Sequence, residues 1–90
     1  MAINLPLNDL NNPGEPEEPT LNASNIPHAV RHGAIHGALD TRQVGQSMIL
    51  IAPHNPLPLL DEIEARTETF TVDYLKEGPG DWHLRLTRTA

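Results

Sequence analysis

The sequence predicts an α+β domain whose elements follow the order strand, helix, strand, helix, strand, strand. Three observations favour this fold. Apolar residues recur at helical spacing within 29–42, an unbroken apolar run occupies 47–52, and apolar and polar residues alternate in 70–75 and 82–87. A strand–helix–strand crossover within one sheet makes its two strands parallel, and the last two strands form a hairpin.

The first half of the domain supplies one strand, one helix and a second strand. The stretch "TLNAS" (20–24) is a short strand, and Pro27 can open the helix that follows it. "SMILIA" (47–52) has the length and the composition of an interior strand. The apolar face of the intervening helix is expected to consist of Val30, Ala34, Ile35, Ala38 and Leu39.

The second helix begins within "APHNPLPLLDEIEA" (52–65). Asn55 is expected to cap it, and Pro56 and Pro58 fall in the first turn, where backbone N–H groups have no intrahelical partner. The expected buried stripe is Leu59, Leu60 and Ile63, with Asp61, Glu62 and Glu64 in solvent. "FTVDYL", "KEGPGD" and "WHLRLT" then predict a hairpin with a Gly-Pro loop.

Charge and composition set the domain boundary. Residues 1–20 contain four acidic residues, four prolines and no Lys or Arg, which predicts a disordered acidic tail before a single domain at 21–90. The formal net charge of −6 argues against nucleic-acid binding through phosphates. With no secretory signal and no membrane-length apolar run, we expect a soluble cytoplasmic protein. The absence of cysteine excludes thiolate chemistry.

Topology places three histidines near one end of the sheet. His28 and His32 follow the first strand, and His54 follows the second, so both junctions should lie where open α/β sheets usually bind ligands. His28, His32 and His36 repeat every four residues and share a helical face. His28 and His36 would be about 12 Å apart along the axis, too far for one metal ion, so the three cannot share one.

Three stretches, "LNASNIPHAVRHGAI", "SMILIAPHNPLPLL" and "FTVDYLKEGPGDWHLRLTR", resemble the small bacterial family called domain of unknown function 2249, over residues 21–88. The resemblance implies a TusA-like fold, a two-layer sandwich of two helices on one face of a mixed four-stranded sheet. It also implies a protein partner, with haemerythrin-like and iron–sulfur-related proteins as candidates. The similar family prefers an apolar side chain where His36 stands, so we interpret His36 as a half-buried packing residue. In the similar sulfur carriers a cysteine followed by proline begins the first helix. His28 and Ala29 stand there in this chain, which excludes persulfide transfer by that mechanism.

The candidate site therefore consists of His32, His54 and His28, with Arg31, Asn55 and Glu77 in support. Two imidazoles can bind a transition metal or haem iron, so iron, zinc and haem are the candidate cofactors, with further ligands from Glu77, a partner chain or water. In the alternative, His28 and His32 lie on a solvated helix face, His54 caps the helix or bonds a backbone carbonyl, and Arg31 pairs with a surface carboxylate.

Two functions follow from these alternatives. One is an accessory module that binds a metal or small ligand through the histidines at the strand carboxyl ends. The other is a protein-interaction module without ligand chemistry. An enzyme acting alone is not expected, because Ser24 and Ser47 lack a nucleophile-elbow pattern and the chain has no Gly-rich phosphate loop.

Overall fold

The computed structural model describes residues 18–90, and its elements follow the predicted order. A single turn of 3-10 helix, η1, separates the first strand from the first α-helix. The elements are β1 (Thr20–Asn22), η1 (Ala23–Asn25), α2 (His28–Asp40), β2 (Ser47–Ala52), α3 (Leu57–Glu64), β3 (Phe70–Glu77) and β4 (Trp82–Arg88).

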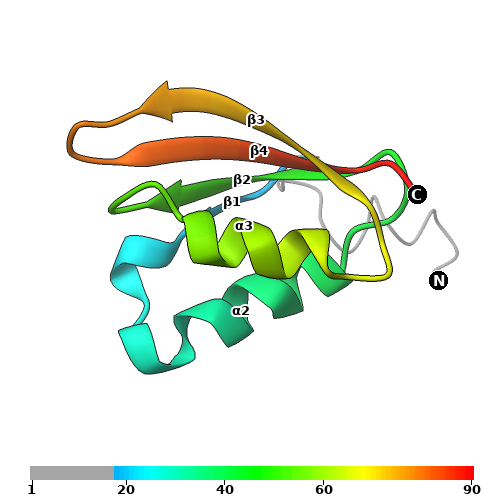
Figure 1. Ribbon diagram of the computed structural model, residues 1–90, viewed down its shortest axis with the longest axis horizontal. Helices are drawn as coiled ribbons and strands as arrows, with labels where there is room; N and C mark the ends of the chain where they lie inside the picture. Colours follow the sequence, from blue (N-terminus) through cyan, green and yellow to red (C-terminus); the bar gives the residue numbers. More distant parts are fainter. Residues whose placement is uncertain (1–17) are drawn as a thin grey trace, which may run out of the picture.

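The four strands form one mixed sheet in the order β1-β2-β4-β3. β1 pairs with β2 in parallel, as the crossover predicts, whereas β4 is antiparallel to both β2 and β3. Both helices lie on the same face of the sheet, so the molecule has two layers (Figure 1). The predicted α+β fold with the order β-α-β-α-β-β is confirmed.

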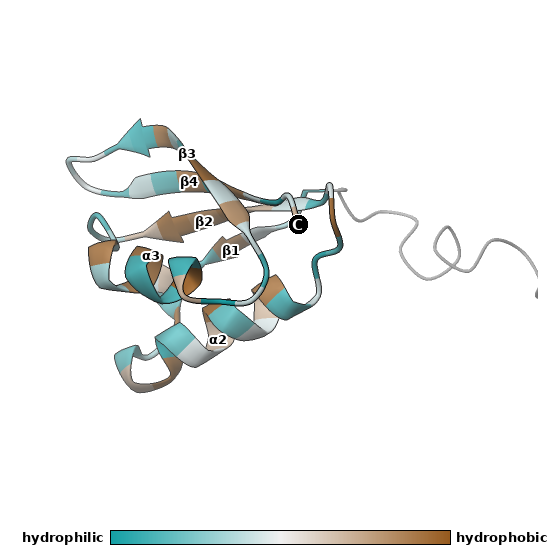
Figure 2. Ribbon diagram, turned by 45° about the vertical axis from the view of Figure 1, so that its right-hand side comes forward, coloured by the Kyte–Doolittle hydropathy of each residue, from teal (hydrophilic) through white to brown (hydrophobic). Residues whose placement is uncertain are grey.

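The core lies between the sheet and the two helices. Along β2, whose residues are largely apolar (Figure 2), every second side chain is buried. Met48 and Leu50 of this strand belong to one buried cluster with residues of both helices. Removing each large side chain of this kind from water stabilises the fold by roughly 1.5–3 kcal/mol. The buried cluster consists of Ala23, Ile35, Leu39, Met48, Leu50, Leu59, Ile63 and Leu86.

The predicted apolar face of α2 is only partly buried. Ile35 and Leu39 are core residues, but Val30 is 57% exposed. The first turn of α2, which carries Val30, lies farther from the sheet than the rest of the helix (Figure 1). Helical spacing gives the direction of a side chain but not the distance of each turn from the sheet.

The predicted cap of α3 is wrong. The helix begins one residue later, with Pro56 at the N-cap position and no side-chain capping bond. Had Asn55 been the cap, the next two N–H groups within reach would be those of positions 57 and 58. The Leu57 N–H already donates to the Asn55 carbonyl at 2.9 Å, and Pro58 has no N–H group. The Asn55 side chain is therefore left for another partner.

The acidic stretch before β1 contributes directly to the folded domain. Glu18 accepts hydrogen bonds from Ser47 Oγ at 2.5 Å and from Arg85 Nε at 2.5 Å. These bonds, with the Arg85 bond first, lower the pKa of the Glu18 carboxyl. Glu18 and Thr20, where β1 begins, both belong to the segment that composition assigned to the tail. Residues 1–17 of that segment lie outside the described part of the chain.

The β3–β4 hairpin is confirmed, and its register shifts between Tyr74 and Lys76. Its turn contains Gly78, whose φ of 70° is one that L side chains rarely adopt. The Tyr74 and Trp82 rings pack edge to face with centroids 6.1 Å apart. Within residues 18–90, no helix has both the length and the apolar character needed to cross a membrane.

Candidate functional site

A pocket of about 540 Å³ opens where β1 and β2 end and α2 and α3 begin. The residues around it come from the two junctions that topology predicts to lie at one end of the sheet. They are Ala23, His28, Ala29, Arg31, His32, Ile35, Ala52, Pro53, His54, Pro56, Pro58 and Leu59.

The floor of the pocket is apolar and buried. Ala23, which follows β1, and Ala52, the last residue of β2, are 0% and 4% exposed, and Ile35 and Leu59 of the two helices are equally well covered. The two alanines have short side chains at the strand ends, so space remains that a larger residue would fill. The prolines of the β2–α3 junction supply further apolar surface.

His32 is held from outside the pocket by a carboxylate of the neighbouring helix. Its Nδ1 lies 2.9 Å from Oε2 of Glu62 in α3. Hydrogen bonds from His36 and His32 keep the pKa of the Glu62 carboxyl below its ordinary value, so this carboxylate is ionised at neutral pH and can only accept. His32 must therefore carry its proton on Nδ1, which leaves Nε2 as the ring nitrogen available to a ligand.

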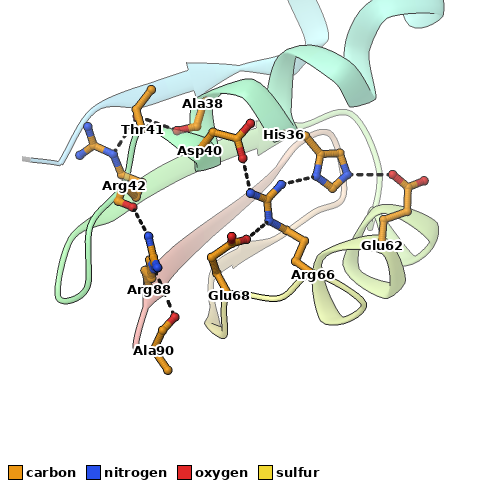
Figure 3. Close-up of polar contacts among 10 residues, drawn as sticks. All are labelled: His36, Ala38, Asp40, Thr41, Arg42, Glu62, Arg66, Glu68, Arg88 and Ala90. Atoms are coloured by element: carbon orange, nitrogen blue, oxygen red, sulfur yellow. Dashed lines mark hydrogen bonds and ion pairs between the residues drawn. The ribbon is translucent and has the colours of Figure 1, made fainter.

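His36 continues the same network toward the far ends of the helices (Figure 3). Its Nε2 lies 2.9 Å from Glu62 Oε1, and its Nδ1 accepts a hydrogen bond from Arg66 Nη1 at 2.8 Å. An arginine can only donate, so His36 carries no proton on Nδ1 and donates through its Nε2 N–H group to Glu62. Arg66 also pairs with Asp40 and Glu68. His36 is half-buried, as predicted, but it bridges the helices through polar contacts.

Sequence reasoning missed the role of Glu62, which it placed in solvent. The side chain is 45% exposed, yet both of its oxygens bond histidines of α2. The four-residue spacing of His32 and His36 is consistent with one acceptor between them. No local pattern identifies that acceptor, because its choice depends on how α2 and α3 pack together.

His54 is fixed through the other junction. Its Nδ1 donates to the Asn55 carbonyl at 3.2 Å, which again leaves Nε2 available. The Asn55 side chain accepts a hydrogen bond from the Tyr74 hydroxyl at 2.7 Å, so β3 anchors the loop that carries His54. The predicted alternative, in which His54 bonds a backbone carbonyl, thus describes one of its two ring nitrogens.

Arg31 is anchored on the backbone, whereas the alternative had expected a surface carboxylate. Its Nε and Nη2 donate to the Ile26 carbonyl at 3.2 and 3.0 Å. This fork fixes the guanidinium plane beside the pocket. The remaining terminal nitrogen, Nη1, has no hydrogen-bond partner among the described residues.

The structure brings together four of the six residues that the sequence singled out. His28, Arg31, His32 and His54 line one pocket. Asn55 does not line the pocket, but its carbonyl bonds His54 and its side chain bonds Tyr74. Glu77 does not line the pocket and lies exposed in β3, where it pairs with Trp82. Within residues 18–90, no three His, Asp or Glu side chains come together in a way that could hold a metal ion.

These observations define a small α+β domain with a histidine- and arginine-lined pocket at the carboxyl ends of its parallel strands. The chain belongs to the family described as uncharacterized conserved protein (DUF2249), whose model matches residues 20–88. No curated protein and no solved structure matches the chain.

Proposed function

We propose that this protein is a cytoplasmic accessory module that binds a small ligand in the pocket at the ends of β1 and β2. The observation that carries the proposal is the composition of that pocket. His28, Arg31, His32 and His54 line it together with buried apolar residues. Concave, mostly apolar sites with a few fixed polar groups are typical of small-molecule binding.

The candidate cofactors iron, zinc and haem fit this pocket less well than an organic ligand does. His32 and His54 each keep Nε2 available, and the hydrogen bond on Nδ1 orients each ring, as such bonds do for histidines that bind metals. A protein metal site, however, usually needs three or four ligands, and the described residues assemble no set of three. A bound metal would need ligands from a partner or from water.

We further propose that the fold is TusA-like. Two helices on one face of a mixed four-stranded sheet support this relationship, which the resemblance to the sulfur carriers implies. His28 begins α2, at the position where those carriers hold their cysteine. Ligand binding at this end of the sheet would then use the same part of the fold with imidazole in place of thiol chemistry.

An amide-shift titration of the ¹⁵N-labelled chain tests the proposal. Zinc, ferrous iron, haem and small organic anions are added in turn to the wild type and to the His32→Ala and His54→Ala variants. We expect at least one probe to shift residues of the two junctions, and both variants to weaken that response. His83→Ala is the matched control, because His83 bonds Asp81 at the hairpin and does not line the pocket. If no probe shifts the junctions, the proposed function is wrong.

A second candidate function is docking of a partner protein on the same end of the molecule. Val30 and Leu57, in the first turns of α2 and α3, are each 57% exposed and flank the residues that line the pocket. Haemerythrin-like and iron–sulfur-related proteins are the candidate partners. Titration of such a protein into the ¹⁵N-labelled chain should broaden the amide signals of these two helical turns. A Val30→Ser, Leu57→Ser double variant should abolish this broadening.

A further inference from the structure

We infer that the ligand of this pocket is a small organic carboxylate whose anionic head contacts Arg31 and whose apolar body rests on the buried floor. This inference rests on the proposed function and specifies its ligand. It follows from the charge of the pocket lining, the anchoring of Arg31, the Nδ1 hydrogen bonds of His32 and His54, and the composition of the floor.

The pocket has the opposite charge character to the rest of the chain. The formal net charge is −6, but the lining contains one arginine, three histidines and no Asp or Glu. The carboxylate bonded to a lining residue, Glu62, uses one oxygen for His32 and the other for His36. A cation entering the pocket would meet a guanidinium and no free carboxylate, whereas an anion would meet a complementary charge.

Arg31 is suited to bind the head group because its position is already fixed. The Ile26 carbonyl holds Nε and Nη2, so the side chain loses little additional conformational freedom when a ligand binds. The Nη1 group can donate to a carboxylate oxygen, and such charge-assisted bonds are shorter and stronger than neutral ones.

The imidazoles add donors when they gain a proton. With Nδ1 of His32 on Glu62 and Nδ1 of His54 on a carbonyl, a proton taken from solvent can add only at Nε2. A neutral ring presents a lone pair there and a protonated ring presents an N–H group. Binding of a carboxylate should therefore be coupled to proton uptake. The charged or titratable groups that surround these two rings are Glu62, His36, Arg31 and His28.

The floor selects an apolar body. The buried side chains of Ala23, Ile35, Ala52 and Leu59 offer no polar atom to a ligand. A fully polar anion such as phosphate would gain the contact with Arg31 but would make no apolar contact with this surface. A ring or a short branched chain carrying one carboxylate satisfies both parts of the pocket.

The test compares benzoate, benzamide and inorganic phosphate as probes of the ¹⁵N-labelled full chain. Benzoate and benzamide share a ring and differ in the charge of the head group. We expect benzoate to shift the amides of both junctions and to bind about tenfold more tightly than benzamide, the ratio expected from one charge-assisted bond. Benzoate affinity should rise as the pH is lowered while benzoate itself stays ionised, because a protonated imidazole presents an N–H group to the carboxylate. Calorimetry in buffers of different ionisation enthalpy should register the proton uptake.

Two arginine variants form a matched pair. Arg31→Gln should weaken benzoate binding about tenfold. Arg42→Gln should leave it unchanged, because Arg42 is likewise anchored on a carbonyl, that of Ser47, but lines a smaller pocket at the opposite ends of the strands. His54→Gln, at an exposed position, is a second variant in case Arg31→Gln does not fold, and it should remove part of the proton uptake.

Each contrary result has a separate meaning. Equal binding of benzoate and benzamide, or equal effects of the two arginine variants, overturns the anionic head group while ligand binding itself stands. Binding of phosphate as tight as that of benzoate overturns the organic carboxylate. If only zinc, iron or haem shifts the amide signals of the junctions, this inference is overturned and the proposed accessory function stands. If no probe shifts them, both are overturned.

Discussion

The carboxylate of Glu62 in α3 accepts a hydrogen bond from Nδ1 of His32 in α2 at 2.9 Å. This contact joins a pocket residue to a residue that does not line the pocket, across the interface between the two helices. It determines which nitrogen of His32 is free. The second bond of Glu62, to His36, links that contact to Arg66 and its partners Asp40 and Glu68 (Figure 3).

Glu62→Gln should change the protonation pattern of His32. A glutamine side chain offers a donor as well as an acceptor, so it no longer requires the proton to reside on Nδ1. We expect the ¹⁵N imidazole signals of His32 to move toward a mixture of the two tautomers. Glu64→Gln, an exposed position on the same helix, is the control. Unchanged His32 signals in Glu62→Gln would show that Glu62 does not fix the ring.

Acid should weaken the β3–β4 hairpin through Asp81. Hydrogen bonds from Lys76 and then His83 lower the pKa of the Asp81 carboxyl from 3.8 to about 2. Because the folded pKa lies below the unfolded one, the stabilisation is fully present above 3.8 and is lost as the pH falls toward about 2. The melting temperature of Asp81→Asn should therefore decline less than that of the wild type in this window. An exposed carboxylate of α3 provides the control variant Asp61→Asn, and a decline identical to wild type in Asp81→Asn would refute the assignment.

The element order could be predicted from sequence because each part of it is local. Helical spacing, an unbroken apolar run and strict alternation all lie within short windows, and the crossover rule converts their order into a parallel pair. That rule brought His28, His32 and His54 to the same end of the sheet, and the three line one pocket. The insertion of β4 between β2 and β3 has no local signal, since hairpin formation does not determine which hairpin strand meets β2.

The supporting contacts of the site could not be predicted in the same way. Asn55 and Tyr74 are 19 residues apart, and His32 and Glu62 are 30 apart. Each pair depends on the packing of whole elements, so residue type alone leaves the partner open. Asn55 shows how a local rule fails: its capping role is lost because Pro58 lacks an N–H group and the Leu57 N–H bonds the backbone.

Gly78→Ala should destabilise the domain through the hairpin turn. Gly78 has a φ of 70°, and a Cβ atom there would lie 3.2 Å from two atoms of the Trp82 ring. We expect the free energy of unfolding to fall by about 1–2 kcal/mol, the usual cost of a left-handed conformation for a residue with a side chain. Gly80→Ala is a close control, because no atom lies within 4 Å of its Cβ, and its effect should stay within about 0.5 kcal/mol. Urea unfolding of both variants measures these free energies. Equal losses in Gly78→Ala and Gly80→Ala would contradict the role of the Gly78 conformation.

Tyr74 and Asn55 should be energetically coupled, because their bond of 2.7 Å ties β3 to the loop that carries His54. Tyr74→Phe removes the hydroxyl and keeps the ring, which can still pack edge to face on Trp82. We expect a loss of about 0.5 kcal/mol, at the lower end for a hydrogen bond because the side chain is 38% exposed. Amide exchange at His54 and Asn55 should become faster, because the loop loses its anchor. The double-mutant cycle with Asn55→Ala isolates the bond. If the double variant loses less free energy of unfolding than the sum of the two single variants, the side chains are coupled. Fully additive losses would mean that the two side chains act independently and that β3 does not position His54.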